Sequence, residues 1–155
     1  DWSSDVCSSD LVLKAMGALT RISPGSIVLA ADTLVACGRR VLMKAVDSKE
    51  AQAFLSLLSG RRHRVHTGLC MIRSGEMHQR LVTTVVQLKR LTGQEIQSYV
   101  ESNEWQGKAG AYAIQGRASV FVKTINGSYS NVVGLPLYET YLLLTNFGYR
   151  LPVAD

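Results

Sequence analysis

The chain has 155 residues, of which 46% are hydrophobic and 19% are charged, and a chain of this length supports one hydrophobic core rather than two domains. No apolar run approaches the roughly 18 residues of a membrane-spanning helix, so the composition argues against a membrane protein. The net charge of +5 and the pI near 9.3 suit an anionic partner, such as a nucleotide, a nucleic acid or an acidic surface.

The chain begins with Asp1 to Leu11 (DWSSDVCSSDL), which is rich in serine and aspartate and has little apolar periodicity. It fits no targeting template, and we expect a non-native, adaptor-like segment, with an ordinary disordered terminus as the alternative. The predicted domain is therefore residues 12–155. Outside this segment, Cys37 and Cys70 lack the spacing of a zinc site, which favours reduced thiols in the cytoplasm.

The first predicted strand spans residues 26–35, a nearly uninterrupted apolar run that ends with Asp32 and Thr33 close to its boundary. A turn then leads to a short strand at residues 40–44. Asp47 and Glu50 form a D-x-x-E helix start, and the spacing predicts a helix that continues to Ser59-Gly60.

Alternating residues over 63–72 and 81–88 predict a long antiparallel hairpin around the Ser74-Gly75 turn. Thr92 and Glu95 form a capping box for a helix to about residue 102. Residues 118–125 predict a further strand, and Pro136 begins a last helix. The buried face of that helix is predicted to contain Tyr138, Tyr141, Leu142 and Leu144. This order indicates an α/β fold with a mixed, partly antiparallel sheet flanked by helices.

Three motifs look like parts of a nucleotide site: ADT at residues 31–33, GKAGAYAIQG at 107–116 and NGSYSNVVGLP at 126–136. Their glycines let the backbone approach a ligand closely. Lys108 can meet a phosphate, and the Gln115 amide can read a base edge. Asp32 follows apolar residues, so it either faces a cleft or is buried with a partner, because an unpaired buried carboxylate is costly. Its position alone leaves catalysis and a structural capping role equally open.

These motifs resemble the Maf family of nucleoside triphosphate pyrophosphatases, over about residues 28–147. The resemblance implies a Maf/inosine-triphosphatase-like domain whose first strand and Ser/Arg phosphate loop are missing from this chain. It also implies hydrolysis of dTTP or UTP to the monophosphate and pyrophosphate, with Asp32 as general base and a divalent cation, Mg²⁺ or Mn²⁺, as cofactor. The sequence assigns no metal ligand.

Four further residues are implied to bind the nucleoside triphosphate: Thr33, Lys44, Lys108 and Gln115. The Thr33 and Gln115 pair resembles the dTTP/UTP subgroup, since a carboxamide can accept from N3–H of thymine or uracil and donate to O4. A flipped Gln115 amide serves cytosine equally well, so this residue alone does not fix the base.

Two other functions stay open: a non-catalytic basic module that binds nucleic acid or a division protein, and a house-cleaning pyrophosphatase for modified purine triphosphates. Nucleic acid is not the expected partner, because the chain lacks interleaved aromatic residues. We interpret Arg39-Arg40 and the basic run at residues 61–64 as a solvated rim. Residues 128–131 are interpreted as structural and Trp105 as a packing residue, and a homodimer is left open.

Overall fold

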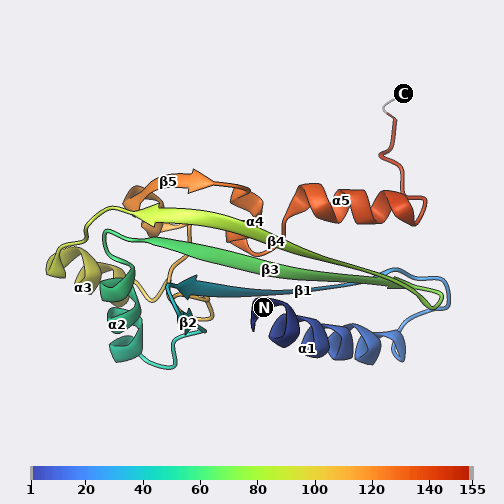
Figure 1. Ribbon diagram of the computed structural model, residues 1–155, viewed down its shortest axis with the longest axis horizontal. Coiled ribbons are helices and arrows are strands. Elements are labelled where there is room, and N and C mark those ends of the chain that lie inside the picture. The colour runs from blue at the N-terminus through green and yellow to red at the C-terminus, as the bar shows by residue number, and fades with distance from the viewer. Residues whose placement is uncertain (1, 154–155) are drawn as a thin grey trace.

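The computed structural model describes residues 2–153, with side chains described from residue 9 onward. At its centre is a five-stranded sheet in the order β2-β1-β3-β4-β5 (Figure 1). The strands are β1 (Val28–Cys37), β2 (Arg40–Leu42), β3 (Arg62–Arg73), β4 (Glu76–Leu88) and β5 (Val122–Asn126). The helices are α1 (Trp2–Leu19), α2 (Ser48–Leu58), α3 (Gly93–Glu101), α4 (Tyr129–Val133) and α5 (Leu137–Asn146), with a 3-10 turn η1 (Arg117–Phe121) before β5.

The predicted single α/β domain is confirmed, and its sheet is antiparallel in every pair that the described residues form. A mixed sheet was expected. A parallel pair needs a crossover that returns the chain to the same end of the sheet. Here β1 and β2, and then β3 and β4, are joined by tight turns, and α2 brings the chain back to β1 in the opposite direction.

The predicted hairpin is confirmed and is longer than the pattern indicated, since Arg73 pairs with Glu76 directly across the turn. The turn residues Ser74 and Gly75 have φ values of 50° and 82°. Two positive φ values in a two-residue loop match the twist of antiparallel strands. The hairpin supplies the two longest strands of the sheet, and the rest of the fold is built on it.

The predicted helix starts are also confirmed. The Asp47 carboxylate accepts from the backbone N–H of Glu50 at 2.8 Å and begins α2. At α3 the Thr92 hydroxyl accepts from Glu95 N–H at 3.1 Å, while the Glu95 carboxylate accepts from Thr92 N–H at 2.8 Å. Both caps satisfy backbone donors that a helix leaves unpaired at its first turn.

The helices cover the two faces of the sheet unequally. The main core packs α2 and α3 against Val35, Val65 and Val86 on one face, and α5 packs further along that face against Leu69 and Met71. The opposite face is covered by α1, and Figure 1 shows α1 and α5 on opposite sides of the sheet. None of the helices among residues 2–153 combines the length and apolarity that a membrane span needs.

Helix α1 was not predicted from the sequence, and it includes most of the segment expected to be adaptor-like. Leu11 and Ala15 are buried against Val28, Cys70 and Ile72. The buried apolar residues of this helix are therefore four residues apart on one side, and the exposed apolar residues Leu13 and Met16 obscure that spacing in the sequence. The non-native origin of residues 1–11 stays a prediction.

Two other predictions are wrong in detail. Residues 118–121 belong to η1 rather than to a strand, because Ala118 and Phe121 are both buried and lie three residues apart, the repeat of a 3-10 turn. In α5 the buried residues are Thr140 and Leu143. The predicted face is therefore out of register: Tyr138 is exposed and Thr140 is buried. The Thr140 hydroxyl tolerates burial because it donates to the Pro136 carbonyl at 2.8 Å.

Candidate active site

The candidate site lies where β1 loses its outer neighbour. Strand β2 pairs only with residues 35–37 of β1, so the segment 28–34 is an open edge among the described strands. We expected Asp32 and Thr33 near the end of the strand. They lie instead in the middle of β1. Successive side chains of a strand point to opposite faces. An open edge lets a cavity reach both of these neighbours.

One cavity of about 210 Å³ at this edge is lined by every residue that the sequence analysis selected: Asp32, Thr33, Lys44, Lys108 and Gln115. Its walls come from β1, from the segment after β2, from the loop that contains residues 107–115, and from α4 with Gly134. The chain thus brings together groups up to 83 positions apart, as between Asp32 and Gln115. The five predicted residues supply one carboxylate, two ammonium groups, one hydroxyl and one amide, a set suited to an anionic polar ligand.

The glycine-rich loop is held by specific hydrogen bonds. The backbone N–H of Gly110 donates to the carbonyls of Leu42 and Met43 at 3.1 and 3.2 Å, and Ala109 forms an antiparallel bridge with Lys44. Gly110 has a φ of +70°, and a Cβ there would lie 3.0 Å from the Val35 side chain. Glycine therefore lets the loop lie against β1 and brings the backbones of Lys44 and Lys108 side by side.

Two residues of the preceding segment anchor the same loop. The Tyr99 hydroxyl accepts from Ala113 N–H at 2.9 Å, and the Glu104 carboxylate accepts from Arg117 N–H at 2.7 Å. Trp105 is buried and donates to the Val100 carbonyl at 3.0 Å, which fits the predicted packing role. Gln115 thus lies on a loop fixed at both ends.

Asp32 has an ionic partner that sequence reasoning missed. The Lys14 ammonium of α1 lies 3.4 Å from the Asp32 carboxylate. The Asp32 side chain is 42% exposed, so it is neither deeply buried nor distant from the cavity. On β3 the residue directly opposite is Gly68, which has no side chain to cover it. Only the packing of α1 on the sheet reveals Lys14, because no motif connects it with Asp32.

Helix α4 closes the far wall of the cavity. Its N-cap is the Ser128 hydroxyl, which accepts from Asn131 N–H at 3.2 Å. The buried Asn131 amide nitrogen lies 3.2 and 3.3 Å from the carbonyls of Val65 and Val82 and 2.9 Å from the Thr84 hydroxyl, and it shares its two protons among these acceptors. These bonds support the predicted structural role of residues 128–131. They pin α4 to β3 and β4 and so fix the position of Gly134 in the cavity wall.

A buried polar pair lies behind the loop. His63 Nε2 and the Tyr112 hydroxyl are 2.7 Å apart, and Tyr112 lines the cavity. Burial lowers the pKa of His63 to about 4 and raises the pKa of Tyr112 above its usual range. Both groups are therefore neutral near pH 7, and the pair acts as a rigid support for the loop. A metal role for His63 is not expected from these contacts.

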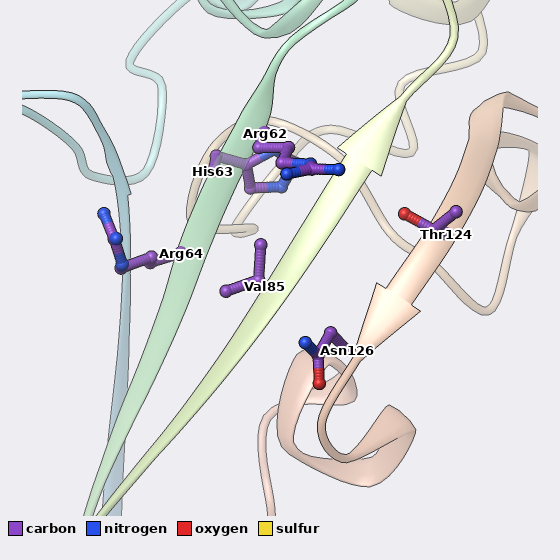
Figure 2. A pocket seen from close by; sticks show the side chains of 6 residues that line it. All are labelled: Arg62, His63, Arg64, Val85, Thr124 and Asn126. Carbon is purple, nitrogen blue, oxygen red and sulfur yellow. The ribbon is translucent and has the colours of Figure 1, made fainter.

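A larger hollow of about 480 Å³ lies elsewhere on the sheet, over β3, β4 and β5 (Figure 2). It is lined by Arg62, His63, Arg64, Val85, Thr124 and Asn126. Neither guanidinium has an ion-pair partner within residues 9–153. The hollow contains no carboxylate and none of the five residues of the cavity at β1, so we assign the candidate site to the latter.

The divalent cation implied by the resemblance fits the cavity only in part. No group of three or more His, Cys, Asp or Glu side chains capable of holding a metal occurs among the described residues. Asp32 is the one carboxylate in the cavity lining. A magnesium ion commonly binds through one or two carboxylates together with substrate phosphates. The donor set therefore fits a cation that arrives with a triphosphate.

Comparison with known proteins places these features in one family. The family described as Maf-like protein matches residues 9–147. The dTTP/UTP pyrophosphatase of Paramagnetospirillum magneticum (strain ATCC 700264 / AMB-1) is 58% identical over 127 residues, 81% of this chain and 67% of the relative. The proteins of the same name from Mesorhizobium japonicum and Wolbachia pipientis wMel are 56% and 51% identical, again over 81% of this chain. The chain spans 61–67% of the length of these relatives.

Proposed function

The chain belongs to the Maf-like protein family, and on that premise we propose that it is a nucleoside triphosphate pyrophosphatase that converts dTTP and UTP to the monophosphate and pyrophosphate. The relatives named above support the substrates by their names. The observation that carries the proposal is structural: the five residues selected from the sequence line a single cavity. The five side chains come from three separate segments of the chain: β1, the segment after β2 and the loop that contains residues 107–115.

In this proposal Asp32 is the general base. Its carboxylate is partly exposed at the cavity, where it can orient a water and take its proton as the water attacks the α-phosphorus. The Lys14 ammonium beside it adds positive charge at the point where a triphosphate would lie. The α–β phosphoanhydride bond breaks, and pyrophosphate leaves with the bonding electron pair.

Lys44 and Lys108 are the proposed phosphate ligands. Their backbone segments are joined by the bridge between Lys44 and Ala109, so both side chains start from one fixed part of the cavity wall. Each carries a flexible ammonium group that can neutralise part of the charge of a triphosphate. A divalent cation held by Asp32 and the phosphates would supply further charge neutralisation and polarise the phosphoryl group.

Thr33 and Gln115 are the proposed base-reading residues. Both line the cavity, and neither carries a formal charge. A hydroxyl and a carboxamide can together recognise the edge of a pyrimidine ring.

The reduced, buried thiols of Cys37 and Cys70 suit the cytoplasm, where such nucleotides are found.

The test is pyrophosphate release with magnesium from dTTP, UTP, CTP and 7-methyl-GTP. Asp32→Asn should lower turnover of dTTP and UTP by about 10²–10⁴-fold while the circular dichroism spectrum is retained. Asp47→Asn is the matched control, because asparagine is as good an N-cap as aspartate and Asp47 lies outside the cavity.

Equal turnover by Asp32→Asn and Asp47→Asn would show that Asp32 is not the base. If the folded protein cleaves none of the four nucleotides, the pyrophosphatase proposal is wrong for this chain. The hollow lined by Arg62 and Arg64 would then be the first place to test for binding of an anionic partner.

A further inference from the structure

A buried threonine lies on the neighbouring strand, directly beside the proposed base-reading hydroxyl. Thr67 of β3 is fully buried and pairs with Thr33 of β1 across the sheet. Their hydroxyl oxygens are 2.9 Å apart. Each hydroxyl also lies near one backbone carbonyl: Thr67 is 3.4 Å from the oxygen of Asn131, and Thr33 is 3.5 Å from the oxygen of Gly134. The four groups form a short chain from the cavity wall into the core.

The number of hydroxyl protons limits the directions in which these hydrogen bonds can be donated. A threonine hydroxyl has one proton to donate and lone pairs with which to accept. If Thr67 donates to the Asn131 carbonyl, the short contact requires Thr33 to donate to Thr67. If instead Thr67 donates to Thr33, the Asn131 carbonyl loses the Thr67 proton, and the Gly134 carbonyl, at 3.5 Å, offers the Thr33 proton only a long contact. The first arrangement places both hydroxyl protons in hydrogen bonds within the protein, and in it the Thr33 oxygen accepts from the cavity side.

We propose that Thr67 is a positioning residue that fixes the Thr33 hydroxyl as a hydrogen-bond acceptor and so selects uracil and thymine against cytosine. The inference rests on the proposed function and deepens it. Uracil and thymine carry an N–H donor at N3, whereas cytosine has a lone pair there. With the Thr33 oxygen accepting from N3–H, the Gln115 amide donates to O4 of uracil or thymine. By a flip the same amide would accept from the N4 amino group of cytosine, so Gln115 alone does not discriminate. The Thr33 hydroxyl, whose proton is donated to Thr67, is an acceptor in this arrangement.

The surroundings of Thr33 suit this role. Gly134 has a φ of +129°, and a Cβ built on it would lie 4.0 Å from the Thr33 hydroxyl oxygen. That separation is an ordinary van der Waals contact, and the positive φ is what favours glycine at this position. The carbonyls of residues 131 and 134 are fixed because the Asn131 amide pins α4 to both β3 and β4. Since the acceptors cannot move, the direction of the Thr33 proton is set before a ligand arrives.

The test compares Thr67→Val with Thr67→Ser. Valine keeps the shape of threonine and removes the hydroxyl, whereas serine keeps it. Pyrophosphate release from UTP and CTP mixed in one reaction gives the ratio of the two kcat/KM values. We expect Thr67→Val to lower the UTP:CTP ratio by about tenfold, the effect of one hydrogen bond gained or lost, and Thr67→Ser to restore it. A purely structural role would lower both activities together and leave the ratio unchanged.

Binding of UMP and CMP, measured by isothermal titration calorimetry, gives a second readout that does not require turnover. The ratio of their dissociation constants should change in the same direction. If Thr67→Val does not fold, Thr33→Val is tested in its place. This substitution removes the acceptor itself and should lower the UTP:CTP ratio. An unchanged ratio in a folded, active Thr67→Val protein overturns this inference alone. Absence of both cleavage and nucleotide binding in the unmodified chain overturns the proposed function as well.

Discussion

Acidification should destabilise this protein through one buried histidine. In the folded chain, burial lowers the pKa of His63 from 6.5 to about 4. As the pH falls, the unfolded chain takes up the proton first, so the contribution of neutral His63 is complete above pH 6.5 and is lost towards pH 4. For one such site the loss between pH 7 and pH 5 is about 2 kcal/mol. In a domain of this size that equals about 4–8 °C in melting temperature.

The measurement is urea unfolding at pH 7, 6 and 5 for the unmodified protein and for His63→Phe. The variant should be less stable at pH 7, by about 1–3 kcal/mol, because it leaves the Tyr112 hydroxyl buried without its partner. Carboxylates titrate in both proteins, so their effect cancels in the difference. The difference in the free energy of unfolding between the two proteins should decrease by about 2 kcal/mol from pH 7 to pH 5.

Tyr112→Phe is the control, since it removes the hydroxyl but keeps the buried imidazole and hence the pH dependence. A gap between His63→Phe and the unmodified protein that stays constant from pH 7 to pH 5 would refute the reasoning. It would mean that the imidazole takes up a proton in the folded chain as easily as in the unfolded one.

Three further substitutions test the framework around the site by urea unfolding. Gly127→Ala should cost more stability than Gly38→Ala, because both glycines have positive φ but only at Gly127 would a Cβ lie 2.7 Å from a hydroxyl, that of Thr84; equal losses would contradict this. Asn131→Ala should cost about 1–3 kcal/mol, because the buried hydrogen bonds that hold α4 to β3 and β4 are lost. Thr92→Ala should cost about 1 kcal/mol by removing the capping box, and Thr92→Ser should recover most of that loss.

The parts of the fold that the sequence predicted are those decided by near neighbours. The capping box of α3 needs only Thr92 and Glu95, and the hairpin turn needs only Ser74 and Gly75, so both could be read correctly. The wrong predictions concern helices whose buried face is determined by contacts with residues distant in the sequence. In α5 the apolar residues are spread around the helix, and packing against Leu69 and Met71 decides which of them is buried.

Helix α1 illustrates the same limit. Its buried residues Leu11 and Ala15 find their contacts on β1 and β3, at Val28 and Cys70. Leu11, Ala15 and Leu19 recur at helical spacing, but the exposed apolar residues Leu13 and Met16 lie between them and obscure the pattern. The consequence for the site is direct, because Lys14, which lies next to Asp32, could be found only once α1 had been placed on the sheet.

For the site, motifs identified the side chains that line the cavity but not the geometry that makes them one site. If the strand had ended at Asp32, the Asp32 carboxylate would face a cleft at the strand end, and no short neighbouring strand would be needed to make room for it. Instead β1 continues to Cys37, and strand alternation sends Asp32 and Thr33 to opposite faces. They share a cavity because β2 is only three residues long and leaves the edge of β1 open at this point. The short β2 is therefore part of the site: if β2 paired with residues 31–34, it would fill the space into which Asp32 and Thr33 both reach.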